Sequence, residues 1–133
     1  MSTLTSDQIT RATDDLVAAF AATDTSSYFA CFSPDATFVF HPEATRLNDR
    51  AAYEALWATW LDDGWRVVSC TCSDRMIQIL GDAAVLSHTV DTVTSIDGNE
   101  STTRERESIV FALDDEHRLV AVHEHLSPVP ADA

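Results

Sequence analysis

The stretch that decides the fold runs from Glu107 to Pro128 and reads ESIVFALDDEHRLVAVHEHLSP. Two runs rich in apolar and β-branched residues, 107–113 and 118–126, flank a polar break at 114–117. This pattern is typical of an antiparallel hairpin. The second run ends in the cluster His123-Glu124-His125, whose titratable side chains either line a cavity or face a partner.

Upstream of this hairpin, apolar residues alternate with polar ones and predict more strands. The expected strands cover about residues 65–80, bent near 73–74, and residues 83–96. Gly81-Asp82 and residues 97–100 are turn signals that separate these strands from each other and from a further strand over about 102–113. The second half of the chain is therefore expected to be a meander of antiparallel strands.

The first half of the chain has a helical period instead. Ile9, Leu16 and Phe20 belong to an apolar stripe that predicts a helix over about residues 6–22. Further elements are expected, namely a short helix over 27–32 stopped by Ser33-Pro34-Asp35, a strand over 36–41, and a helix from Asn48 or Asp49 to about Asp63. Helices followed by consecutive strands predict an α+β domain with the helices on one face of a curved sheet.

Length and charge limit the classes of function. The chain has 133 residues, which suits a single domain over 1–133, with 1–5 and 129–133 expected as flexible tails. Its formal net charge is −14 and all its basic residues are arginines, which argues against nucleic acid and anionic membrane as partners. No apolar run approaches the roughly 20 residues of a membrane span, and the N-terminus does not read as a secretion signal. We expect a cytoplasmic protein.

Three motifs carry a resemblance to a known family. They are Ser33-Pro34-Asp35-Ala36, Phe40-His41-Pro42-Glu43-Ala44, and the ending from Val122 to Pro128. With this order of elements, the chain resembles the SnoaL-like branch of the nuclear transport factor 2-like and ketosteroid isomerase superfamily, and its ending is similar to the association domain of calcium/calmodulin-dependent protein kinase II. The resemblance implies a cone, in which a strongly bent antiparallel or mixed sheet wraps around three helices and leaves a deep pocket. It also implies a homodimer through the outer face of the sheet.

The resemblance also implies which side chains face the pocket. Its inward set is Asp91, Glu107, Ile109, Glu124 and Leu126, with Tyr53, Trp57 and Trp60 as an aromatic wall on the third helix. His123 and His125 then lie on the outer face, because successive strand residues point to opposite sides.

The register of the strands leaves an alternative open. A two-residue turn at Gly98-Asn99 would pair Asp91 with Arg106, whereas a three-residue loop would pair Asp91 with Glu105 or Glu107. The choice decides whether histidines or carboxylates line the pocket.

Acid–base chemistry is the candidate activity. Asp91 in an apolar cavity would have a raised pKa and suit general base catalysis, with Glu107 or Glu124 as a second carboxylate and His41 near the pocket mouth. The alternative is that these acids face solvent or pair with arginines. His123 and His125, with His88 or His41, form an incomplete metal site, so neither a metal nor a cofactor is expected.

Two functions remain open from the sequence. One is a cofactor-independent isomerase, cyclase or dehydratase that acts on a small hydrophobic molecule. The other is a non-catalytic dimeric domain that binds a ligand or serves assembly. The chain carries no unmistakable catalytic pair, so the sequence does not choose between them.

Overall fold

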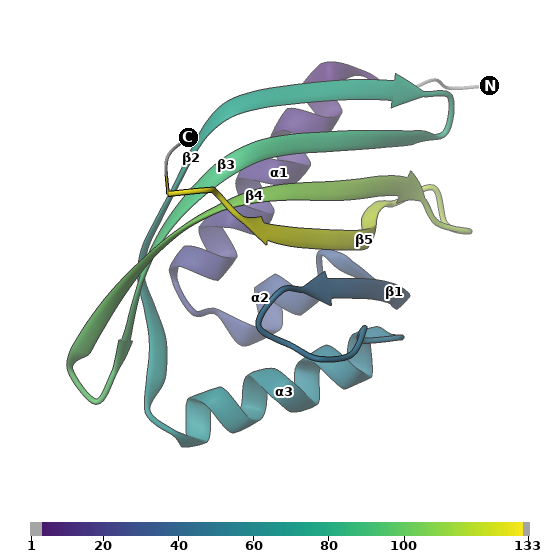
Figure 1. The fold of residues 1–133 in the computed structure, drawn as a ribbon. Helices are drawn as coiled ribbons and strands as arrows, with labels where there is room; N and C mark the ends of the chain where they lie inside the picture. Colours follow the sequence, from purple (N-terminus) through teal and green to yellow (C-terminus); the bar gives the residue numbers. More distant parts are fainter. Residues whose placement is uncertain (1–3, 132–133) are drawn as a thin grey trace.

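A five-stranded curved sheet with helices on one side forms the structure, a computed structural model that describes residues 4–131 (Figure 1). The elements in chain order are α1 (Ser6–Ala21), α2 (Thr25–Phe29), β1 (Phe32–Phe40), α3 (Arg50–Asp62), β2 (Trp65–Leu80), β3 (Ala83–Ile96), β4 (Asn99–Leu113) and β5 (Leu119–Pro128). The strand order is β1-β5-β4-β3-β2, in which β1 is parallel to β5 and all other neighbours are antiparallel. The expected α+β class, with a bent mixed sheet and three helices, is confirmed.

The helices begin where the sequence provides capping side chains. Thr5 and Gln8 form a capping box at the start of α1, in which each side chain bonds the other residue's backbone N–H. Asp24 and Asp49 are the N-caps of α2 and α3, and each side chain accepts a hydrogen bond from a backbone N–H group in the first turn of its helix. Because α2 begins at Thr25 and ends at Phe29, it is shorter and earlier than the helix expected over 27–32.

The first strand begins earlier than expected, at Phe32 rather than residue 36. Phe32 already pairs with Ala121 of β5, and the regular register resumes at Thr37 after an irregularity. The Ser33-Pro34-Asp35 segment therefore lies within the strand as a bulge, a place where sheets tolerate proline.

The chain ends were expected to be flexible tails, and part of them is packed. Leu4 is buried and Thr5 caps α1, while Val129 donates a backbone hydrogen bond to Arg104. Residues 1–3 and 132–133 of the expected tails lie outside the described residues. Within 4–131, no helix is both long enough and apolar enough to cross a membrane.

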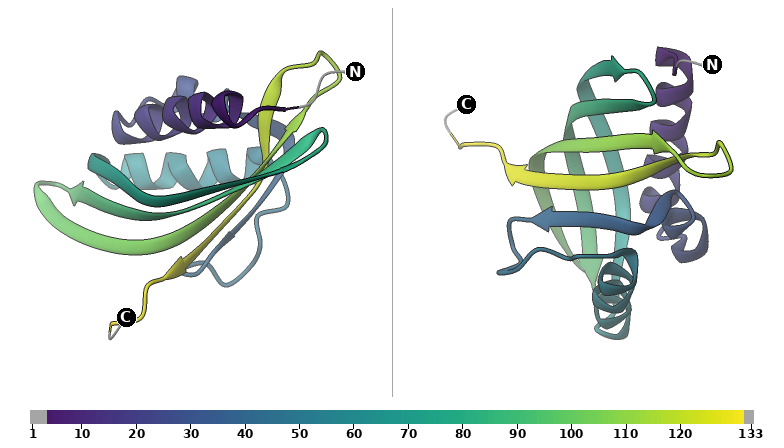
Figure 2. Two further views of the ribbon diagram at one scale, coloured as in Figure 1. Left: turned by 90° about the horizontal axis from the view of Figure 1, so that it is seen from above. Right: turned by 90° about the vertical axis from the view of Figure 1, so that its right-hand side faces the viewer.

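The core lies between the helices and the concave face of the sheet (Figure 2). Its centre is a cluster of aromatic side chains, since the rings of Tyr28, Phe32, Phe38, Tyr53 and Trp57 are nearly or wholly buried. Tyr28 stacks on Trp57 with ring centroids 5.0 Å apart, and Tyr53 packs edge-on against Phe38 at 4.7 Å. This cluster fixes α2 and α3 against β1.

The turn between β3 and β4 decides which side chains face the helices. Asp97 and Gly98 form a two-residue turn, so Ile96 pairs with Asn99 and Asp91 with Arg104. Both registers expected from the sequence are therefore wrong, because the turn lies one residue earlier than Gly98-Asn99 and has no third residue.

Candidate functional site

A cavity of about 300 Å³ opens between the helices and the inner face of the sheet. Most of its wall is apolar, but carboxylates from four glutamates also reach it. The lining residues are Leu16, Val17, Phe20, Tyr28, Phe40, Pro42, Glu43, Tyr53, Trp60, Trp65, Cys70, Val90, Thr92, Thr94, Ile96, Thr103, Glu105, Glu107, Glu124 and Leu126. A mostly apolar cavity with a few convergent polar groups is the usual form of a small-molecule site.

Glu107 and Glu124 lie side by side on the inner face. Glu107 of β4 is paired with Leu126 of β5, and Glu124 is paired with Ile109, so the two glutamates are diagonal neighbours. Both are buried, with Glu107 9% and Glu124 3% exposed. Two carboxyl groups this close in an apolar setting cannot both ionise without a large electrostatic cost.

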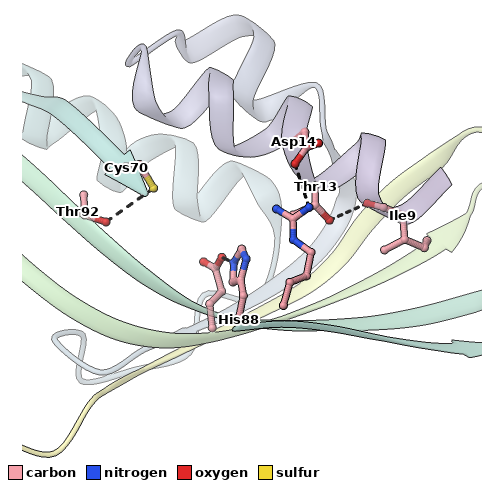
Figure 3. A network of polar contacts seen from close by, with 8 residues as sticks. Ile9, Thr13, Asp14, Cys70, His88 and Thr92 are labelled. Atoms are coloured by element: carbon pink, nitrogen blue, oxygen red, sulfur yellow. Dashed lines mark hydrogen bonds and ion pairs between the residues drawn. The ribbon is translucent and has the colours of Figure 1, made fainter. Parts of the chain in front are cut away.

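A buried histidine supports one of the two carboxylates. His88 of β3 lies opposite Glu107, and its Nε2 is 2.7 Å from Glu107 Oε1 in an ion pair. Burial alone would lower the pKa of His88, but its contacts with Cys72 and Glu107 outweigh burial and raise the pKa to about 9. His88 is therefore an imidazolium at neutral pH and places a positive charge beside Glu107. Figure 3 shows His88 projecting from the sheet on the side of the helices.

Glu124 has no such support. Its Oε1 is buried and, among the described residues, has no hydrogen-bond partner. Burial, followed by the charge of Glu107, a hydrogen bond to Glu107 and the charge of Glu105, raises the pKa of Glu124 well above its ordinary value. The site thus holds one carboxylate beside an imidazolium and one carboxyl group that is biased toward its neutral form.

Two tyrosine hydroxyls lie on the helix side of the cavity. The hydroxyl oxygens of Tyr28 and Tyr53 are 2.9 Å apart, and both residues line the cavity. Burial and the charge of Glu124 raise the pKa of both phenols well above the ordinary value. Both are therefore neutral at physiological pH, and since only one proton is used in the bond between them, the other remains available to a ligand.

A pair of thiols borders the carboxylates. Cys70 and Cys72 are two residues apart on β2, and Thr92 donates to Cys70 Sγ over 3.9 Å (Figure 3). A hydrogen bond from Cys70, together with His88, lowers the pKa of Cys72 to about 5, while the same bond and burial raise the pKa of Cys70. Both thiols are free and half-buried.

The mouth of the cavity holds a second histidine–glutamate pair. His41, which follows β1, has its Nε2 2.5 Å from Glu105 Oε2. Glu105 lines the cavity, and so do Pro42 and Glu43 beside His41. His41 does not line the cavity itself and is connected to it through Glu105.

The structure places most of the predicted pocket residues at the cavity. Tyr53, Trp60 and Leu126 line it, as do the predicted carboxylates Glu107 and Glu124. Trp57 and Ile109 lie behind the wall instead. Trp57 is 1% exposed and donates its indole N–H to Thr25 Oγ1, and Ile109 is fully buried.

The expected inward position of Asp91 is wrong. Its strand neighbours Val90 and Thr92 line the cavity, so Asp91 points to the opposite face. There its side chain is 39% exposed and lies 3.9 Å from the guanidinium of Arg104. The geometry thus separates Asp91 from the other predicted carboxylates.

The two histidines of the closing strand lie on the outer face, as the resemblance implied. His123 pairs with Val110 and bonds Thr37 Oγ1 through Nδ1 at 2.8 Å, and burial lowers its pKa. His125 is exposed. Across residues 4–131, no group of three or more His, Cys, Asp or Glu side chains is arranged to hold a metal ion.

Sequence reasoning did not place three contributors in the site, namely His88, Tyr28 and Glu105. His88 was named only as a candidate metal ligand, and alternation put it on the face opposite Asp91 without showing which face was inside. Tyr28 lies in a short helix whose inward face cannot be recognised from one turn. Glu105 was assigned only as one potential partner of Asp91.

Comparisons with known proteins agree with this architecture. A family model described as a SnoaL-like domain matches residues 9–132. A search among curated proteins finds no match. The resemblance stated from the sequence motifs is thereby confirmed.

Solved structures with the same fold come from several bacteria. A nuclear transport factor 2-like superfamily protein from Salmonella enterica has a TM-score of 0.82 and 18% identity, with 96% of this chain and 92% of that chain covered. A protein named as a candidate dehydratase of the same superfamily, from Streptomyces avermitilis, has a TM-score of 0.79 and 18% identity over 94% and 96%. A candidate calcium/calmodulin-dependent protein kinase II association domain from Xanthomonas campestris has a TM-score of 0.74 and 18% identity over 93% and 87%. At these identities the likeness shows the fold alone.

Proposed function

The chain belongs to the SnoaL-like domain family, and from its cavity we propose that it is a cofactor-independent acid–base enzyme for a small hydrophobic molecule. The reaction class is proton abstraction next to a carbonyl, followed by isomerisation or loss of water. The observation that carries this proposal is the carboxyl pair, in which Glu107 is ion-paired with His88 while Glu124 is buried without a counter-charge.

The two carboxyl groups divide the work of a general base and a general acid. Environments that push the pKa values of neighbouring groups apart are typical of acid–base sites. Glu107, which is ion-paired with His88, is the base that accepts a proton from carbon. Glu124, whose pKa is raised by burial and by Glu107, is the acid.

Each proton has a defined place in this scheme. Glu107 takes the proton from the carbon acid, and the electron pair moves to the substrate carbonyl oxygen, which accepts a hydrogen bond from Glu124 or from the Tyr28–Tyr53 pair. Return of the proton from Glu107 to a different carbon completes an isomerisation. In a dehydration, Glu124 instead protonates the departing hydroxyl, and the proton held by Glu107 then passes to the neighbouring Glu124, which restores both groups.

The dimensions of the cavity support a small substrate. Its volume of about 300 Å³ lies at the lower end of the range for ligand sites. Rings such as Tyr53, Trp60 and Trp65 line it, and they suit a flat apolar body. The Streptomyces relative that is named as a candidate dehydratase is consistent with this reaction class.

Hydrogen–deuterium exchange tests the proposal without a known substrate. Small cyclic ketones, including one that carries an amine, are incubated with the protein in D₂O, and loss of the α-proton signals is followed by NMR. We expect the wild-type protein to accelerate exchange of at least one ketone. Glu107→Gln should lower that rate by about 100-fold or more, because it removes the base.

The matched control is Asp91→Asn, which removes one carboxylate from the opposite face of the same sheet and should leave the exchange rate unchanged. Absence of acceleration by the wild-type protein would overturn the proposal. So would a Glu107→Gln variant that is folded and as fast as the wild type.

The alternative is a non-catalytic dimeric domain that binds a ligand or serves assembly. The resemblance to the kinase association domain is what favours it, and the Xanthomonas relative is named as a domain of that kind. Ligand-dependent shifts of cavity residues without any exchange would select it. The homodimer through the outer face of the sheet stays a prediction, which sedimentation equilibrium would check.

A further inference from the structure

The cavity has an unusual balance of charge for an apolar site. Four carboxylates line it, from Glu43, Glu105, Glu107 and Glu124, and none of the lining residues is an arginine or lysine. A carboxylate or phosphate ligand would find no arginine or lysine to pair with there. The charges of the wall therefore select against anions before any shape is considered.

Histidines lie against only half of these carboxylates. His88 pairs with Glu107 and His41 pairs with Glu105. Among the ion pairs of residues 4–131, none involves Glu43 or Glu124. The neutralising histidine of the deeper pair, His88, does not line the cavity, and its side chain is fully buried. A ligand in the cavity therefore meets the carboxylates and not the cation behind them.

The floor of the cavity carries an independent sign of a missing partner. Glu124 lines the cavity and is 3% exposed, yet its Oε1 has no hydrogen-bond partner among the described residues. A buried acceptor without a donor destabilises the folded state, because it has lost its hydrogen bonds to water and gained none. An N–H group of a bound ligand is the kind of partner that this oxygen lacks.

The apolar part of the wall is also suited to a cation. Six aromatic rings line the cavity, from Phe20, Tyr28, Phe40, Tyr53, Trp60 and Trp65. Ring faces attract cations, and the effect is larger when the cation is desolvated. Rings and carboxylates together are the surroundings that recognise ammonium groups in proteins.

We infer that the cavity selects a small protonated amine with an apolar body as its ligand. The ammonium group brings a positive charge to a wall that has four acidic side chains and no arginine or lysine, and it offers an N–H donor to the unpartnered oxygen of Glu124, while the aromatic rings hold the body. The inference deepens the proposed function, because it names the substrate class of the same cavity. It is tested by binding alone, so it can fail while the acid–base proposal stands.

Three probes of similar shape separate charge from hydrophobicity. They are 2-phenylethylamine, which is cationic at pH 7, neutral 2-phenylethanol and anionic 3-phenylpropanoate. Binding is followed by tryptophan fluorescence, since Trp60 and Trp65 line the cavity and Trp57 contacts both. We expect the amine to bind about tenfold or more tightly than the alcohol, and the anion to bind most weakly of the three.

Single substitutions at the mouth check that the cavity is the site. Glu43→Gln and Glu105→Gln should each weaken the amine several-fold and leave the alcohol nearly unchanged. Asp91→Asn is the matched control, because it removes the same charge from the outer face and should change neither affinity. An alcohol that binds as tightly as the amine would overturn the inference. An amine whose binding is absent, or is unaffected by both glutamate substitutions, would overturn it as well.

Discussion

The two faces of the β3–β4 ribbon carry the same kinds of side chain in opposite circumstances. On the inner face, His88 and Glu107 are 2.7 Å apart and nearly excluded from solvent. On the outer face, Asp91 and Arg104 are 3.9 Å apart, with 39% and 62% of their side chains exposed. Both pairs join directly opposed residues of the same two strands. Burial, and not residue type, is what distinguishes them.

A charge pair changes the protonation of neighbouring groups only where it is shielded from water. Water screens the outer pair, so its members behave like ordinary surface groups. The inner pair is inside an apolar wall, where each charge changes the protonation of its neighbours, as the raised pKa values of His88 and Glu124 indicate. A carboxylate on this ribbon is therefore a candidate for catalysis only if it points toward the helices.

The largest expected effect comes from breaking the inner pair. Glu107→Ala leaves the imidazolium of His88 without its anion and should lower the free energy of unfolding by about 4 kcal/mol, since uncompensated buried charges are costly. The matched change on the outer face, Asp91→Ala, should cost about 0.5 kcal/mol or less. Urea denaturation of both variants at pH 7 measures the two values.

Equal losses in the two variants would show that burial does not distinguish the pairs. If Glu107→Ala is too unstable to purify, Glu107→Gln keeps the shape of the side chain. It should still lose clearly more stability than Asp91→Asn.

The second effect is a pH dependence that belongs to the inner face. The pKa of His88 rises from an ordinary 6.5 to about 9 on folding, so the folded state holds this proton more tightly than the unfolded state. The contribution of His88 is fully present below pH 6.5 and is lost as the pH rises to 9. The lowered pKa of Cys72, about 5 against an ordinary 9, stabilises the fold increasingly over the same range and offsets this loss in the wild type. Thermal unfolding of Cys72→Ser between pH 6 and pH 9.5 should therefore show the decline that comes from His88.

Adding His88→Asn to Cys72→Ser should flatten that decline, because the titrating group is gone. The matched control is His117→Asn in the same background, in the exposed turn before β5, which should keep the Cys72→Ser slope. A Cys72→Ser stability that is constant across this range would contradict the protonated state of His88.

The sequence predicted β2 and β3 well because the turn residues between them mark where each strand ends. The strands over 65–80 and 83–96 have the bounds that alternation and the Gly81-Asp82 turn predicted. The family resemblance then placed Glu107, Glu124 and Leu126 at the cavity correctly.

The face of Asp91 could not be settled in the same way. Both faces of β3 are similarly apolar, with Leu86 and Val90 on one and Val85 and Val93 on the other, so alternation alone does not say which is inside. His88 and Asp91 are three residues apart and must point in opposite directions, and only the packing of the helices chooses between them. The missing hydrogen-bond partner of Glu124 could not be predicted either, because it depends on which side chains surround the carboxyl group in the folded structure.

The smallest expected effect concerns Glu124 and has the opposite sign. In the folded protein the buried, unpartnered carboxyl group of Glu124 ionises only at a pH well above 4.5, whereas in the unfolded chain it ionises above its ordinary pKa of 4.5. The folded state therefore loses stability relative to the unfolded state as the pH rises from 4.5 toward the raised pKa. Glu124→Gln removes that cost and should raise the free energy of unfolding by about 1 kcal/mol at pH 8, as substitutions at strained functional sites often do. Glu100→Gln, at an exposed position of β4, is the matched control and should change little.

A Glu124→Gln variant that is less stable than the wild type at pH 8 would mean that the carboxyl group is held by the fold rather than reserved for a ligand. A more stable variant that no longer exchanges ketone protons would show that the fold gives up stability at this position for function.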